Sequence, residues 1–172
     1  MRRLKSKTGK VILLIAITIL VFILWQIGLE SVHARILGGC TNASLHLFGS
    51  DKSIQYLPDD DHVAIFRIRL IKDGLPNEFK QEIGPLLQPT VIVLAWQLFL
   101  FLVLPLKKAF RLLLINLAIF IGLQVFFLIQ LTGFHTSSFQ KFLYRLMVDS
   151  FYIIALILLI KDNLLYPVFR KN

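Results

Sequence analysis

The sequence predicts an α-helical membrane protein with four transmembrane helices and a small β-containing external segment between the first two. The chain of 172 residues is 56% hydrophobic with a mean hydropathy of +0.73, which would leave a soluble domain covered in apolar surface. It contains long apolar runs, and each is long enough for a helix to cross a hydrocarbon core of about 30 Å. Clusters of Lys and Arg lie at or near the ends of these runs.

The predicted spans are residues 11–29, 89–106, 112–131 and 142–160. The first of them contains no charged residue. An alternative for this run is a cleaved export signal, because Val32 to Ala34 has the small-residue spacing of a cleavage site. Signal peptides have an apolar core of only about 7–15 residues, so the longer run favours an uncleaved anchor.

The distribution of basic residues predicts the orientation. Residues 1–10, 107–111 and 161–172 carry an excess of Lys and Arg and are predicted to be cytoplasmic. In residues 30–88 acidic side chains outnumber Lys and Arg, so this segment is predicted to be periplasmic. We therefore expect a multi-pass protein of a bacterial inner membrane with both termini in the cytoplasm. The basic side chains, which give the chain a net charge of +9, are expected to contact anionic lipid rather than nucleic acid.

The external segment is predicted to contain three short strands between turn sequences. Before them, the first helix is expected to continue outward through Glu30–Leu37 until Gly38 and Gly39 stop it. After them, an interrupted amphipathic stretch is expected at the membrane interface, because Pro and Gly residues divide it. The predicted strands are Ser44–Phe48, Ser53–Leu57 and His62–Lys72, and the amphipathic stretch is Leu75–Leu87.

The third predicted strand has the clearest alternating pattern. Phe66, Ile68 and Leu70 fall on one face, whereas Arg67 and Arg69 fall on the other. A sheet this small does not bury such an apolar face on its own. We therefore predict that Phe66, Ile68 and Leu70 bind a partner protein or rest on the bilayer surface.

Residues suited to catalysis or to metal binding are sparse. Cys40 is the only cysteine, which excludes an internal disulfide or a CxxC site. An enzyme hypothesis uses Cys40 as a nucleophile, a nearby His as the base and Arg35 as an anion clamp. The spacing of His33, Cys40 and His46 matches no zinc pattern, and Asp59–Asp61 are expected to form a solvated turn. No catalytic, metal-binding or cofactor-binding residue is therefore predicted.

Polar side chains within the spans are expected to face other helices, because exposing them to lipid is costly. In the third span Asn116, Gln124 and Gln130 fall within an arc of about 120° and are predicted to face the bundle. Gln97, which follows Trp96 in the second span, is a candidate partner for them.

Asp149 is the acid inside the predicted fourth span, and Arg145 precedes it by one helical turn. The structural interpretation is a local ion pair that sets the depth of the helix. The functional interpretation is a carboxylate that carries protons or contacts a substrate. We favour the structural interpretation, because one acid does not make a relay.

Several features of the chain occur together in one known family of small membrane proteins. The first span is an anchor with its N-terminus inside, the external segment has strand character, Gly84 to Pro89 opens the second span, and the third span contains Gln. This arrangement resembles the small membrane proteins associated with exosortases, in particular the exosortase H-associated group. In residues the resemblance is confined to the Pro-Leu-Leu opening and the leucine-rich stretch after it. It implies an accessory role in the processing of C-terminal sorting signals and carries over no catalytic residue.

The sequence thus predicts a non-catalytic accessory or scaffolding subunit of an envelope protein sorting, assembly or secretion system. Membrane lipids and a membrane protein are the expected partners, and no cofactor is expected. Two alternatives stay open. One is a membrane-embedded enzyme that uses Cys40 and a His on a peptide or lipid-linked substrate. The other is a small oligomeric transporter subunit that uses Asp149.

Overall fold

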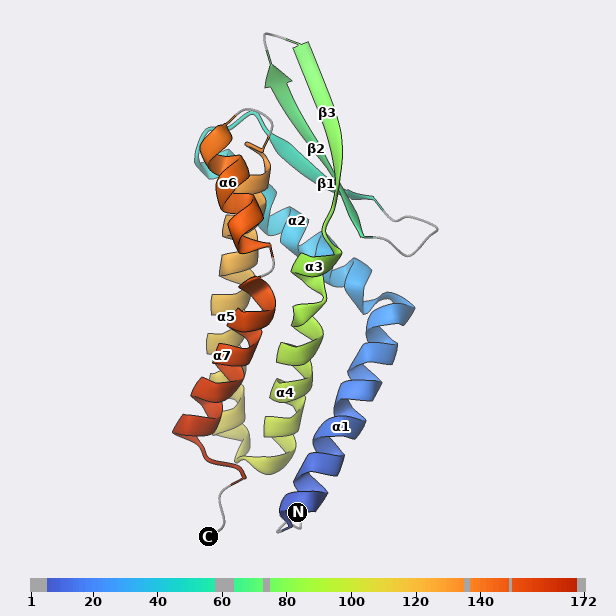
Figure 1. The fold of residues 1–172 in the computed structure, drawn as a ribbon, viewed down its shortest axis with the longest axis vertical. Coiled ribbons are helices and arrows are strands. Elements are labelled where there is room, and N and C mark those ends of the chain that lie inside the picture. Colours follow the sequence, from blue (N-terminus) through green and yellow to red (C-terminus); the bar gives the residue numbers. More distant parts are fainter. Residues whose placement is uncertain (1–5, 58–63, 73–74, 135–136, 149, 170–172) are drawn as a thin grey trace.

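The computed structural model describes residues 6–57, 64–72, 75–134, 137–148 and 150–169. Four helices run side by side as a bundle (Figure 1): α1 (Lys7–Leu24), α4 (Pro89–Val103), α5 (Leu106–Leu131) and α7 (Ser150–Leu165). At one end of the bundle, α2 (Glu30–Leu47) crosses obliquely beneath a sheet of β1 (Ser53–Leu57), β2 (Ile65–Lys72) and β3 (Leu75–Glu82). The remaining helical segments are η1 (Trp25–Leu29), α3 (Gly84–Leu87) and α6 (Ser138–Met147).

The described part of the chain has the predicted class, mainly helical with a small sheet. Three of its helical stretches are long and apolar enough to cross a membrane, namely Lys7–Leu47, Gly84–Val103 and Leu106–Leu131. The stretch predicted as the fourth span is divided between α6 and α7, which meet at an angle of 50°, and it adds a fourth crossing if the bent pair forms one span. α7 also continues to Leu165, so the helix extends into the segment predicted to be a tail.

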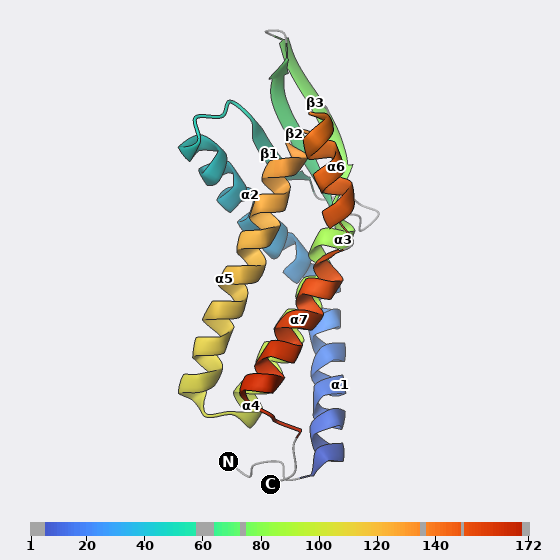
Figure 2. The ribbon, with the colours of Figure 1, turned by 60° about the vertical axis from the view of Figure 1, so that its left-hand side comes forward.

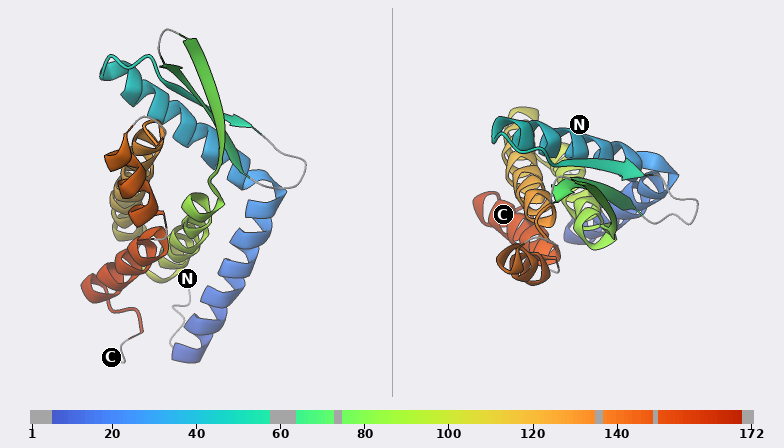
Figure 3. Two further views of the ribbon diagram at one scale, coloured as in Figure 1. Left: turned by 45° about the horizontal axis from the view of Figure 1, so that its top comes forward. Right: turned by 90° about the horizontal axis from the view of Figure 1, so that it is seen from above.

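The direction of the chain changes where the first apolar run ends. α1 passes into α2 through one widened turn, η1, in which Gly28 has a φ of 146°. Residues with a Cβ rarely adopt this conformation, so the glycine is what permits the bend. As a result α2 leaves the direction of α1 and lies across the end of the bundle (Figure 3).

α2 does not stop at Gly38 and Gly39, contrary to the sequence prediction. Gly38 is buried, and a Cβ at this position would lie 3.6 Å from the ring of Phe66. Gly38 therefore lies in the contact between the helix and the sheet, and it does not mark the helix end. The helix ends instead before Gly49, which has a φ of 65°, and the N–H of Ser50 donates to the carbonyl of Leu45 at 3.0 Å.

Two of the predicted strands are confirmed and one is wrong. β1 coincides with Ser53–Leu57, and β2 lies within His62–Lys72, whereas Ser44–Phe48 lies largely in α2, where Leu45 is buried. The third strand is β3, in the stretch expected to be amphipathic and interrupted. It pairs with β2 as an antiparallel hairpin, from Lys72↔Leu75 to Ile65↔Glu82. Pro76 argued against a strand, but β3 is at the edge of the order β1-β2-β3, where proline is tolerated.

The apolar face of β2 is covered within the chain. Phe66 and Ile68 are 0% exposed and Leu70 is 3% exposed. Phe66 and Ile68 belong to the same buried cluster as Ala34 and Leu37 of α2. This corrects the expectation that these three side chains bind a partner or the bilayer surface. Phe66, on the hydrophobic face that looked unpartnered in the sequence, packs against Gly38 of α2.

Candidate functional site: two buried polar clusters

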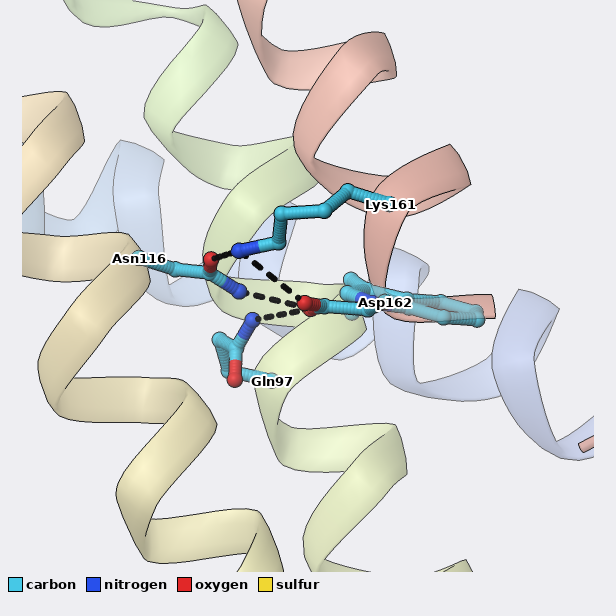
Figure 4. Close-up of polar contacts among 5 residues, drawn as sticks. Gln97, Asn116, Lys161 and Asp162 are labelled. Carbon is cyan, nitrogen blue, oxygen red and sulfur yellow. Dashed lines mark hydrogen bonds and ion pairs between the residues drawn. The ribbon is translucent and has the colours of Figure 1, made fainter. Parts of the chain in front are cut away.

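The first polar cluster centres on Asp162, near the end of α7. Its side chain is 0% exposed. The Oδ2 atom accepts hydrogen bonds from Trp96 Nε1 at 3.0 Å, Gln97 Nε2 at 3.1 Å and Asn116 Nδ2 at 2.6 Å. Figure 4 shows Gln97 and Asn116 reaching the carboxylate from α4 and α5. One oxygen atom therefore joins three helices of the bundle.

Lys161 supplies a positive charge beside this carboxylate. Its Nζ lies 3.3 Å from Asp162 Oδ1 and also donates to Asn116 Oδ1. Asn116 thus bonds to both charged groups, as the donor to the acid and the acceptor from the base. A buried charge is tolerated when it is paired and hydrogen-bonded in this way. With its donors already in place, the carboxylate is suited to holding α4, α5 and α7 together.

Sequence reasoning missed this cluster, because it assigned Asp162 to a cytoplasmic tail. A usable signal was present. The buried residues of α7 are Phe151, Ala155, Leu158 and Asp162, each about one helical turn from the next, so they share one face. Extending the apolar period of the fourth span by one turn places Asp162 on the inward face.

The second cluster lies where α2 crosses the bundle. His33 Nε2 is 3.1 Å from Gln124 Oε1 and 3.2 Å from Thr90 Oγ1. Gln124 Nε2 in turn donates to the carbonyl of Leu86 at 2.7 Å and to Thr90 Oγ1 at 3.2 Å. The three polar side chains are buried and come from α2, α4 and α5. They therefore attach α2, and the sheet it carries, to the helices of the bundle.

The prediction that Asn116 and Gln124 face other helices is confirmed, since both are 0% exposed. Gln130, on the same predicted face, is half-buried. Gln97 was expected to pair with this polar face of α5. It meets Asn116 at a shared acceptor, because both side chains donate to Asp162.

The residues of the enzyme hypothesis do not converge around Cys40. Cys40 is a free, exposed thiol on α2, and Arg35 and His46 are exposed on the same helix. His33 lies seven positions before Cys40, about 10 Å along the helix axis, and its imidazole is bonded within the second cluster. Among the described residues no group of three His, Cys, Asp or Glu side chains is placed to hold a metal ion. Asp59–Asp61 lie outside the described residues.

The Arg145–Asp149 pair stays a prediction. Arg145 is exposed on α6, whereas Asp149 lies outside the described residues. The acid that the structure does bring into the bundle is Asp162.

No protein-family model, curated protein or solved structure matches the chain.

Proposed function

We propose that this chain is a non-catalytic accessory or scaffolding subunit of an envelope protein sorting, assembly or secretion system. The observation that carries the proposal is a platform, formed by α2 and β1–β3, that projects the β2–β3 hairpin beyond the helices (Figure 2). A surface of this kind suits recognition of another protein. The polar side chains inside the bundle meanwhile bond to one another and hold its helices together.

Specific contacts make the platform rigid and close one edge of its sheet. The side chain of Asn42 in α2 donates to the carbonyl of Ile54 at 2.8 Å and accepts from its N–H at 2.8 Å. Asn42 thus satisfies the backbone N–H and carbonyl of Ile54 at the outer edge of β1, much as a neighbouring strand would. The hydroxyls of Ser31 and Tyr56, 3.1 Å apart, add a second tie between α2 and β1. These contacts leave β3 as the edge that a partner can reach.

The face of the hairpin opposite α2 is charged. Arg69 Nε lies 2.5 Å from Glu78 Oε1, and Arg67 Nε lies 3.7 Å from Glu78 Oε2. These side chains are 31–53% exposed, and exposed ion pairs contribute only about 0–1 kcal/mol to stability. Their charges are therefore available for recognition at little cost to the fold. Electrostatic complementarity at such a surface mainly sets the choice of partner.

Charge reversal on the hairpin tests this proposal. With Arg67→Glu and Arg69→Glu together, we expect the amount of partner that co-purifies in mild detergent to fall about tenfold, as for loss of charged contacts worth about 1.4 kcal/mol. Membrane insertion should not change, because it depends on the apolar helices. The first partner to test is a membrane-embedded sorting enzyme, the class that the exosortase-associated resemblance implies.

A charge swap provides the matched control. Arg69→Glu combined with Glu78→Arg retains the cross-strand ion pair but inverts both charges. Binding that stays low in the swap indicates recognition of the charges, whereas binding that returns indicates that only the ion pair mattered. Full recovery of the partner with Arg67→Glu and Arg69→Glu would contradict the proposal.

The proposal includes four crossings of a bacterial inner membrane, with both termini in the cytoplasm and the platform in the periplasm. Two contacts support an even number of crossings. Lys10 Nζ, near the start of α1, donates to the carbonyl of Val168 at 2.5 Å. Lys108, in the first turn of α5, has its Nζ 5.3 Å from the centre of the Tyr166 ring. The beginning of α1, the basic beginning of α5 and the segment after α7 therefore meet at one end of the bundle.

Thiol labelling tests this orientation. Cys40 is exposed on the platform and should react with a membrane-impermeant maleimide added to intact spheroplasts. A cysteine introduced as Lys107→Cys, in a Cys40→Ser background, should react only after the membrane is opened. A reporter fused to the C-terminus should also be active in the cytoplasm. Labelling at position 107 from outside would rule out the four-crossing orientation.

A further inference from the structure

The outer edge of β3 presents a defined set of backbone hydrogen-bonding groups. In an antiparallel ladder, successive residues direct their N–H and C=O groups alternately to one side of the strand and to the other. The N–H of Ile83, which follows β3, donates to the carbonyl of Ala64, which precedes β2, at 2.9 Å. The register continues from this pair through the hairpin one residue to one residue. Odd-numbered residues of β3 therefore bond to β2. The even-numbered residues direct their backbone groups away from the sheet, and they are Pro76, Glu78, Lys80 and Glu82.

Two independent observations agree with this alternation. At the opposite edge of the sheet, Ile54 of β1 stands opposite Ile68, which bonds to β3, so the backbone of Ile54 is directed outward. Both of its groups indeed bond to the Asn42 side chain at 2.8 Å. On β3 the alternation directs the ring nitrogen of Pro76 outward, where the missing N–H costs no bond to β2.

The two edges of the sheet therefore differ. α2 closes the edge at β1, whereas in the described part of the chain no strand pairs with the outer side of β3 (Figure 1). Glu78, Lys80 and Glu82, whose backbone groups face outward, are exposed. Such a row of open donors and acceptors is a template for an added strand.

The side chains beside this edge indicate what an added strand carries. Lys80 stands directly opposite Arg67, and like charges in such a pair are destabilising. Arg67 lies 3.7 Å from Glu78, whereas no ion pair joins Lys80 to a carboxylate of the described residues. On the other face of β3, Phe79 is half-buried and stands opposite the buried Ile68. An acidic side chain beside Lys80 and an apolar one beside Phe79 therefore complement the edge.

We infer that the edge of β3 binds an extended segment of the partner protein, which adds an antiparallel strand to the sheet. The segment has an acidic residue opposite Lys80 and an apolar residue on each side of it. In this mode of recognition main-chain hydrogen bonds supply affinity and alternate side chains supply specificity. The inference rests on the proposed function and names the class of segment that the hairpin recognises.

Amide hydrogen exchange of the full-length chain in mild detergent, resolved by NMR, tests the inference. The probe is the peptide acetyl-Thr-Val-Glu-Val-Thr-amide, and its comparison peptide has Lys in place of Glu. Without peptide, the N–H groups of Glu78 and Lys80 should exchange fast, and those of Phe79 and Gln81 slowly, because they donate to β2. The acidic peptide should slow exchange at Glu78 and Lys80. It should bind about fivefold more tightly than the basic peptide, as for one cross-strand charge pair.

Substitutions at position 80 separate backbone recognition from side-chain recognition. Lys80→Pro removes an outward N–H but no bond to β2, so Phe79 and Gln81 should keep slow exchange while peptide binding falls more than about tenfold. Lys80→Ala is the matched control. It retains the N–H, so binding should persist and only the preference for the acidic peptide should be lost. Unchanged binding by Lys80→Pro would overturn the inference, as would equal binding of the two peptides by the unmodified chain.

The proposed function is tested separately, because the peptide experiment contains no partner protein. If Arg67→Glu with Arg69→Glu releases the partner while the peptides protect no amide of β3, the hairpin recognises charge without adding a strand. The inference then fails and the proposed function stands. If the peptides bind as expected but the partner co-purifies fully with that charge reversal, the strand-binding edge is supported and the proposed function fails.

Discussion

Asp162→Ala is expected to lower the free energy of unfolding by about 3 kcal/mol, as for buried hydrogen-bond donors left without their acceptor. The substitution leaves the Lys161 ammonium without its carboxylate. It also leaves the buried donors of Trp96, Gln97 and Asn116 without their shared acceptor. Titration of the protein from mild detergent into SDS, followed by circular dichroism, measures this free energy.

Two further variants make the Asp162 experiment specific. Asp162→Asn retains the shape and one oxygen acceptor, so its cost should be nearer 1 kcal/mol, as for a single hydrogen bond. Leu164→Ala, at a neighbouring position that is 77% exposed, should change stability little. If the Asp162→Ala variant is as stable as the Leu164→Ala variant, the structural role of Asp162 is contradicted. If Asp162→Asn folds normally yet abolishes function in cells, the transporter alternative gains support, with Asp162 as its acid.

Phe66→Ala is expected to destabilise the packing of the sheet against α2 by about 3 kcal/mol of free energy, as for other deletions of a buried aromatic ring. The Phe66 ring is 0% exposed and packs edge-on against Tyr56, with centroids 6.1 Å apart. It also lies against Gly38 of α2. A protease added outside spheroplasts should therefore cut the hairpin faster, while the helical bundle stays intact.

The control for Phe66→Ala is Gln55→Ala, an exposed position on the neighbouring strand β1. It should leave the rate of hairpin cleavage unchanged. Partner binding should fall with Phe66→Ala, because the platform loses its shape even though the buried ring touches no partner. Equal protection of the hairpin in both variants would show that α2 does not hold the sheet.

Much of the helical part could be predicted from the sequence, because lipid imposes strong rules. Uninterrupted apolar runs identified the stretches that are long enough to cross a membrane. The cost of exposing amides to lipid predicted that Asn116 and Gln124 point inward, as the structure confirms. What the sequence did not show was the acceptor for Asn116, because Asp162 falls beyond the apolar run that was taken to define the fourth span.

The platform of α2 and the sheet was less predictable, because its elements depend on long-range contacts. Gly38 looked like a helix stop, but it is a point of close approach between α2 and Phe66. Pro76 indicated that Leu75–Glu82 is not a strand, because proline cannot donate a hydrogen bond to a neighbouring strand. β3 lies at the edge of the sheet, where this donor is not needed. The apolar face of β2 suggested a missing partner because a small sheet does not bury such a face on its own, whereas these side chains are buried within the chain. Each error came from local signals whose meaning was decided by tertiary packing.

Site-specific photo-crosslinking in cells tests the central claim most directly, namely that the hairpin edge binds a protein partner. A photoreactive residue is placed at Lys80, which is exposed on β3, or at Ile153, which is 61% exposed on α7. The proposal predicts one discrete protein adduct at position 80, lost when Arg67→Glu and Arg69→Glu are added, and none at position 153. A discrete adduct at position 153 with none at position 80 would contradict it and move the binding surface to the membrane helices.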